Sequence, residues 1–150
     1  MKSRTATRAE GRHTEMFKFV IEGEPVAKGR PKLSRYGTYT PKKTKEYEEH
    51  IKQEWRKNGY KEPLKGAVAV SIRFCRGIQK SGSKAVKTAK LTGKVKPTIK
   101  PDLDNYIKAV LDGLNGLAWV DDSQIMNISA TKEYSLEPET VVLIWGEVEE

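Results

Sequence analysis

The strict alternation of apolar and polar residues between positions 67 and 74 constrains the fold more than any other feature of the sequence. Val68, Val70, Ile72 and Phe74 alternate with smaller or polar residues. A period of two residues is typical of a β-strand with one face in a hydrophobic core and the other face toward solvent. The chain therefore contains a sheet, and the segments that cover its apolar face must lie elsewhere in the sequence.

Two segments with helical periodicity are candidates for these covering elements. The first carries apolar residues at every fourth position, Tyr47, Ile51 and Trp55. Thr40-Pro41 resembles an N-cap followed by proline at the first helical position. The second helix is expected to begin at Asp102 or Leu103 and to end near Asn115. Its broader apolar stripe consists of Leu103, Ile107, Val110, Leu111 and Leu114.

Shorter alternating or apolar runs predict three further strands, at residues 17–22, 126–131 and 141–145. The element order is then strand, helix, strand, helix, strand, strand. The last two strands are joined by a short connection and are expected to be antiparallel. A length of 150 residues suits one domain. We therefore predict a single compact α+β domain that contains a mixed β-sheet and two main helices.

Two regions lack apolar periodicity. Residues 1–15 are predicted to form a disordered tail, ahead of a domain that spans residues 16–150. Residues 77–98 are rich in Lys, Ser, Thr and Gly, and we expect them to form a flexible basic loop.

The sequence favours a location in the cytoplasm. It contains no apolar run long enough to span a bilayer, and its charged first residues lack the apolar core of a secretory signal. Cys75 is the only cysteine and cannot form an internal disulfide. We therefore expect a cytoplasmic protein without a membrane partner.

The charge is segregated along the chain. The formal net charge is +8, from 28 Lys and Arg against 20 Asp and Glu. Residues 26–45 and 76–100 contain seven and eight basic residues and no acidic one, whereas residues 133–150 contain six glutamates and no Lys or Arg. One basic window can be solvated surface alone, but two of them favour a polyanionic partner. Nucleic acid is the first partner to consider.

Five aspartates lie between residues 100 and 124, directly after the second basic window: Asp102, Asp104, Asp112, Asp121 and Asp122. At the N-cap of the predicted helix, Asp102 has non-helical dihedrals and can turn its carboxylate toward the side that Asp104 uses in the first turn. Lys108 lies one turn beyond Asp104. Mg²⁺ prefers carboxylate oxygens, and a metal ion beside lysines suits phosphodiester hydrolysis. The group therefore indicates metal-assisted cleavage of nucleic acid.

The same residues also have structural explanations. Asp102 can cap the helix, and Asp104 can complement its dipole. Asp104, Lys108 and Asp112 can form a ladder of ion pairs one turn apart, and Asp121-Asp122 can form a turn. Both explanations stay open on the residues alone.

The segment from Pro101 to Gln124 resembles the signature of the RusA-like Holliday junction resolvases. The matching residues are Pro101-Asp102-Leu103-Asp104-Asn105, Lys108, Asp112-Gly113-Leu114-Asn115-Gly116, Trp119, Asp121-Asp122 and Gln124. A weaker likeness extends over about residues 17–147. The resemblance implies a Mg²⁺-dependent endonuclease that works as a homodimer and cuts four-way DNA junctions in DNA recombination and repair. It implies a catalytic lysine at Lys108 and metal ligands at Asp102, Asp104 and Asp122, and it alone selects Asp122 over Asp121.

The basic windows are expected to contact the DNA backbone, so that shape rather than base sequence guides binding. The predicted contacts are Lys28, Arg30, Lys32, Arg35, Lys84, Lys87 and Lys90. The alternative is a non-catalytic DNA- or RNA-binding protein whose aspartates only cap and brace a helix. Cleavage of a four-way junction with and without Mg²⁺ separates the two hypotheses.

Overall fold

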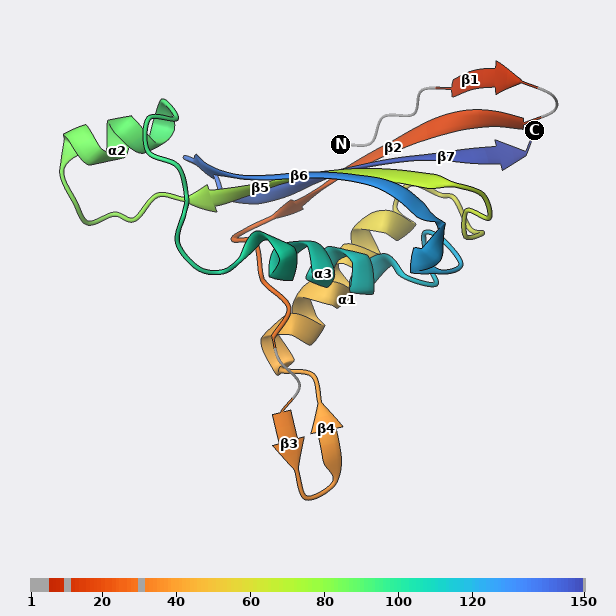
Figure 1. Ribbon diagram of the computed structural model, residues 1–150, viewed down its shortest axis with the longest axis horizontal. Helices are drawn as coiled ribbons and strands as arrows, with labels where there is room; N and C mark the ends of the chain where they lie inside the picture. The colour runs from red at the N-terminus through yellow and green to blue at the C-terminus, as the bar shows by residue number, and fades with distance from the viewer. Residues whose placement is uncertain (1–5, 10–11, 30–31, 150) are drawn as a thin grey trace.

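The computed structural model describes residues 6–9, 12–29 and 32–149, and in it a twisted sheet carries helices on one face (Figure 1). Among these residues the main sheet has five strands in the order β1-β2-β7-β5-β6. The strands are β1 (Ala6–Ala9), β2 (Arg12–Glu22), β5 (Val68–Gly77), β6 (Ile125–Ser135) and β7 (Glu139–Glu149). β5 and β6 are parallel, and the other neighbouring pairs are antiparallel. This architecture confirms the predicted α+β fold with a mixed sheet.

Helices α1 (Lys42–Arg56) and α3 (Leu103–Leu114) cover the apolar face of the sheet (Figure 1). The core forms where their buried side chains meet those of β2, β5 and β7. Phe74 of β5 stacks on Tyr106 of α3, with ring centroids 5.0 Å apart. The two helices approach closely at Gly113, where a Cβ atom would lie 3.2 Å from Ile51. Each large apolar side chain buried in this layer contributes about 1.5–3 kcal/mol to folding.

Both predicted helices are confirmed, with small shifts at their ends. α1 begins after Pro41 and buries the predicted stripe of Tyr47, Ile51 and Trp55. α3 begins directly after Asp102, which takes the N-cap position in an extended conformation. Its most buried side is turned slightly from the predicted stripe and consists of Tyr106, Ala109, Val110, Gly113 and Leu114. Leu103, Ile107 and Leu111 are partly buried and pack against the core.

The first strand begins earlier than its apolar pattern predicts. β2 starts at Arg12 instead of Phe17, and residues 12–15, which were expected in the tail, pair with residues 146–149 of β7. Residues 6–9 of the expected tail form β1 on the outer edge of β2. Backbone pairing needs no apolar side chains, so the hydrophobic pattern does not mark this extension. Residues 1–5, 10 and 11 lie outside the described part of the chain.

Part of the predicted flexible loop is a helix. Residues Lys84–Leu91 form α2, whose N-terminus is capped by Ser83, because the Ser83 side chain accepts a hydrogen bond from the backbone N–H of Val86. All of its residues are partly or fully exposed. The helix therefore has no core-facing stripe, and this is why apolar periodicity does not reveal it.

The last two strands run in opposite directions, as expected, but they are not neighbours. β5 lies between β6 and β7 and pairs with both. The connection at residues 136–138 must therefore pass around the end of β5. Two short strands, β3 (Lys32–Ser34) and β4 (Gly37–Tyr39), form a separate hairpin that projects from the body (Figure 1).

No helix among the described residues is long and apolar enough to cross a membrane.

Candidate active site

The N-terminal end of α3 presents two exposed carboxylates. Asp102 occupies the N-cap with φ −67° and ψ 146°, but its side chain makes no capping hydrogen bond. Asp104 lies in the first turn and is also exposed. Neither carboxylate pairs with a side chain elsewhere in the described part of the chain. The helix dipole favours negative charge at this end, and both groups are open to a cation from solvent.

Two basic side chains hold the segment that leads into α3. Lys132 of β6 donates from Nζ to the carbonyl oxygens of Ile99 and Pro101, both at 2.9 Å. Arg76 of β5 donates from Nη1 to the carbonyl oxygen of Lys100 at 3.0 Å. Because β5 and β6 are adjacent parallel strands, the two contacts attach residues 99–101 to one edge of the sheet. They position the backbone immediately before Asp102.

Sequence patterns do not identify this role for Lys132 and Arg76. Both are basic residues near the ends of strands, and Lys132 is 30 positions or more from the carbonyl groups that it binds. The parallel pairing that brings the two side chains together joins segments far apart in the sequence.

Asp122 lies at the other end of α3. Asn115 caps the C-terminus of the helix and forms an isolated bridge with Trp119. The indole Nε1 of Trp119 donates to Oδ1 of Asp122 at 2.8 Å. A helix of 12 residues is about 18 Å long, so α3 separates Asp122 from Asp102 within one chain. Accordingly, the described residues contain no group of three or more His, Cys, Asp or Glu side chains suited to hold a metal ion.

The structure distinguishes Asp121 from Asp122. The Asp121 carboxylate accepts a hydrogen bond from the backbone N–H of Ser123 at 3.0 Å, and its own backbone N–H donates to Gln124 Oε1 at 2.8 Å. This capping box begins a short 3₁₀ helix, η1 (Asp122–Gln124), and the hydrogen bonds from Ser123 lower the pKa of Asp121. Asp121 therefore has the structural role of a turn residue. Asp122 is only oriented by the indole, through one of its two oxygens.

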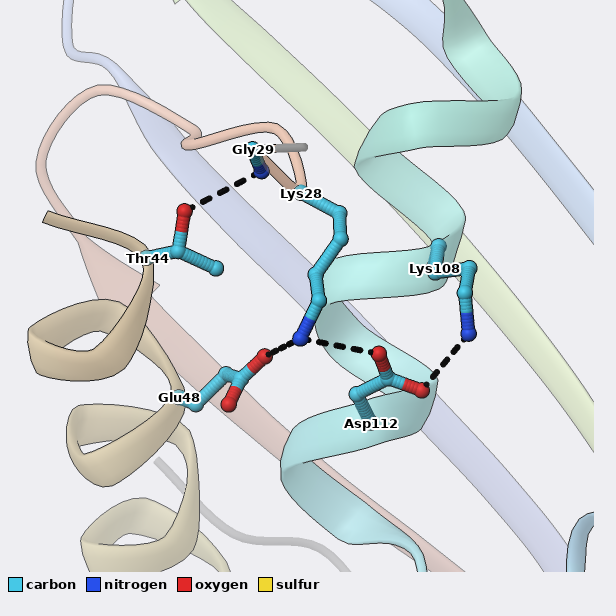
Figure 2. Close-up of polar contacts among 6 residues, drawn as sticks. All are labelled: Lys28, Gly29, Thr44, Glu48, Lys108 and Asp112. Atoms are coloured by element: carbon cyan, nitrogen blue, oxygen red, sulfur yellow. Dashed lines mark hydrogen bonds and ion pairs between the residues drawn. The ribbon is translucent and has the colours of Figure 1, made fainter. Parts of the chain in front are cut away.

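Lys108 takes part in a four-residue ion-pair cluster between α1 and α3 (Figure 2). Its Nζ lies 3.1 Å from Oδ1 of Asp112, whose Oδ2 lies 3.1 Å from Nζ of Lys28. Lys28 also pairs with Glu48 of α1 at 2.7 Å. Two members of the predicted ladder, Lys108 and Asp112, are thus paired, and Asp112 has a second lysine as its other partner.

Lys28 has a structural position that its place in a basic window does not suggest. Its side chain is 19% exposed and bridges the two helices. Burial alone would lower the pKa of Lys28, but the hydrogen bonds and charges of Glu48 and Asp112 outweigh burial and raise it. Nearby, Gly29 donates a backbone hydrogen bond to Thr44 Oγ1 at 3.1 Å, which fixes this loop against α1 (Figure 2). Lys28 therefore links α1 and α3 through ion pairs and has little exposed surface for contact with a phosphate.

The other predicted DNA contacts belong to two projections of the fold. Arg35 lies at the tip of the β3–β4 hairpin, and Lys32 opens β3. Three lysines belong to α2: Lys84 is exposed, Lys87 donates to the carbonyl oxygen of Lys80, and the Lys90 ammonium lies 4.9 Å from the ring centroid of Tyr134. The hairpin and α2 project in different directions from the body (Figure 1). Arg30 lies outside the described residues.

Comparison with known proteins places these residues within one matching segment. A protein-family model described as "Endodeoxyribonuclease RusA" matches residues 22–145, which include the sequence from β5 to the end of β6 and both covering helices. The chain is also 37% identical over 136 residues to the uncharacterized protein YqaN of Bacillus subtilis (strain 168), with 87% of this chain and 96% of that protein covered. The chain belongs to the RusA endodeoxyribonuclease family.

Proposed function

We propose that this protein is a Mg²⁺-dependent, structure-selective DNA endonuclease that resolves Holliday (four-way) junctions by paired phosphodiester cleavage, in DNA recombination and repair. Family membership supports an endodeoxyribonuclease acting on DNA. The observation that carries the proposal is the state of Asp102 and Asp104, which are exposed at the start of α3 although Asp102 occupies a capping position. A purely capping Asp102 would accept a hydrogen bond from the first turn. The open carboxylates favour a ligand role.

The donor atoms suit Mg²⁺, but only two of the three proposed carboxylates belong to the start of α3. Mg²⁺ binds its oxygen ligands at about 2.0–2.1 Å, a distance far shorter than α3. We therefore propose that Asp102 and Asp104 do not share one ion with Asp122 of the same chain. The proposed homodimer resolves this conflict if Asp122 of the partner subunit completes each site. When bound, the ion would activate water and stabilise charge on the phosphate.

The remaining roles follow from charge and exposure. Lys108 points from the middle of α3 with an exposed side chain and is proposed to stabilise the phosphate during cleavage. The Lys108 ammonium donates a hydrogen bond to Asp112, and a bound phosphate would compete with Asp112 for this ammonium. Arg35, Lys84, Lys87 and Lys90 are proposed to contact the DNA backbone, together with Arg30 and Lys32. The net charge of +8 would attract DNA from a distance, and this attraction would weaken as the salt concentration rises.

A cleavage assay on a synthetic four-way junction tests this function. The parent should cut in Mg²⁺ and should only bind in EDTA. Asp102→Asn and Asp104→Asn should each reduce cleavage by orders of magnitude while metal-free binding is retained or strengthened, because a negative charge facing the phosphate is removed. Asp121→Asn is the matched control, since the Asp121 carboxylate serves a turn. A parent that binds junctions and never cuts would favour the non-catalytic alternative.

Mixing two inactive variants tests the shared site. In a mixed dimer of Asp102→Asn and Asp122→Asn chains, one site combines both substitutions and the other combines an intact Asp102 with an intact Asp122. If the ligands come from both chains, the mixture should regain cleavage of one strand. If all ligands came from the same chain, both sites would stay inactive and the mixture would not recover.

A further inference from the structure

The β3–β4 hairpin carries large apolar side chains that no part of the described fold covers. Tyr36 is 90% exposed and Leu33 is 84% exposed. Single exposed apolar residues are common on proteins, but here they lie on a short hairpin that projects from the sheet and helices (Figure 1). The core therefore gains nothing from these two side chains, and both are free to contact a partner.

The tip of the hairpin is organised by its own hydrogen bonds. Ser34 pairs with Gly37 in the ladder, which leaves Arg35 and Tyr36 as the two turn residues. The Ser34 hydroxyl accepts from the backbone N–H of Tyr36 at 3.2 Å and donates to the carbonyl oxygen of Gly37 at 3.0 Å. Gly37 has φ +113°, a conformation that favours glycine. The turn thus presents its two side chains from a defined backbone.

The chemistry of the tip fits nucleic-acid bases. The guanidinium carbon of Arg35 lies 6.0 Å from the ring centroid of Tyr36, so a cation and an aromatic face are presented together. Residues 26–45 contain no acidic residue, so this part of the chain attracts a polyanion and offers nothing that repels one. Aromatic rings and arginine planes that stack on bases, next to cations that bind the backbone, are typical of surfaces for unpaired nucleic acid.

We propose that the β3–β4 hairpin recognises the branch point of DNA by stacking Tyr36 on a base that is unstacked there, while Arg35 contacts the adjoining phosphate. This inference rests on the proposed function and assigns to it the element that distinguishes a junction from a duplex. Within an intact duplex the base faces are covered by their neighbours, and exposing one costs both stacking and pairing. At a branch point that cost is lowest, so a stacking side chain favours the junction.

The test measures binding of full-length protein to a four-way junction and to a linear duplex of the same arm sequence, in EDTA at fixed salt. Tyr36→Ala should weaken junction binding about tenfold, which corresponds to ~1.4 kcal/mol, with less than about a twofold change for duplex. Tyr36→Phe keeps the ring and should bind as the parent does. Leu136→Ala is the matched control, because Leu136 is 77% exposed on the β6–β7 connection and should change neither affinity.

A fluorescent base analogue, 2-aminopurine, placed at the branch point gives a second readout. Its emission should change on binding of the parent and of Tyr36→Phe, and not on binding of Tyr36→Ala. The proposal is overturned if Tyr36→Ala retains the parental preference for junctions, if it loses affinity equally for both DNAs, or if sedimentation shows that it loses its oligomeric state instead. A parent that cuts junctions while Tyr36→Ala keeps full selectivity refutes the hairpin role alone. A parent that binds no DNA refutes the proposed function as well.

Discussion

The ion-pair cluster between α1 and α3 predicts a large loss of stability on substitution of Lys28. Lys28→Met keeps an unbranched side chain of similar length but removes the ammonium that pairs with Glu48 at 2.7 Å and with Asp112 at 3.1 Å. Hydrogen bonds to charged groups contribute about 1.5–3 kcal/mol each when they are well shielded. The two carboxylates are 16% and 23% exposed, and Asp112 keeps Lys108 as a partner in the variant. The loss of stability is therefore smaller than the sum of two fully shielded hydrogen bonds. We expect a loss of about 3 kcal/mol.

Thermal unfolding followed by circular dichroism measures this loss. For a chain of 150 residues, 3 kcal/mol corresponds to a fall of roughly 6–12 °C in Tm. The matched control is Lys57→Met, which removes an ion pair of the same length, 2.7 Å to Glu54, from a lysine that is 64% exposed. An exposed pair of this kind contributes about 0–1 kcal/mol. A Lys28 variant that melts within 2 °C of the Lys57 variant would refute the argument from burial.

The pH dependence of the Lys28 variant supplies an independent check. The pKa of Lys28 is raised above its ordinary value of 10.5 in the folded protein. A raised pKa means that the contribution is fully present below pH 10.5 and is lost as the pH rises through the higher folded value. The difference in stability between parent and Lys28→Met should therefore be constant from pH 7 to about 10 and should shrink above it.

Three further predictions concern the loop before α3, the core and the basic helix. Lys132→Met should reduce Mg²⁺-dependent junction cleavage about 10- to 100-fold, because the backbone of residues 99–101 loses its hydrogen bonds to Lys132. Lys132→Arg should restore much of the cleavage, and equal losses in both variants would contradict a positioning role. Burial raises the pKa of Tyr47 to about 12, so the parent should lose up to roughly 2–3 kcal/mol between pH 10 and 12 in denaturant titrations, and Tyr47→Phe should be less stable at neutral pH but show a flatter curve. Joint replacement of three lysines by Ala should flatten the log-log salt dependence of junction binding by up to about 2.7 units, and an unchanged slope would show that α2 does not touch DNA; these lysines are Lys84, Lys87 and Lys90.

Local patterns were sufficient where a segment's own side chains bury it. The alternation that ends at Phe74 marks β5, and the helical stripes mark α1 and α3, because each pattern reflects one buried face of a single element. The start of α3 was also predictable, since Asp102 is a residue type favoured at the N-cap and directly precedes Leu103. The same residues placed two candidate ligands, Asp102 and Asp104, at one helix end.

Elements held by backbone pairing or by local caps escaped these patterns. Residues 12–15 extend β2 because β7 supplies hydrogen-bonding partners along its whole length. α2 forms around the Ser83 cap and buries no stripe that a periodicity could reveal. In both cases the segment is stabilised by hydrogen bonds, to β7 or to the Ser83 side chain, and its own apolar residues do not reveal them.

The sequence by itself determined the helices and strands that bury an apolar face of their own, and the residue types of the candidate site. Only the tertiary structure decided that β5 lies between β6 and β7, that Lys132 and Arg76 meet at the loop before Asp102, and that Asp122 lies at the far end of α3. Periodicity reports which side of an element is buried, because that depends on neighbours within one or two turns. Strand order and the path of connections depend on contacts between distant segments, so the separation of Asp122 from Asp102 became visible only after the chain had folded.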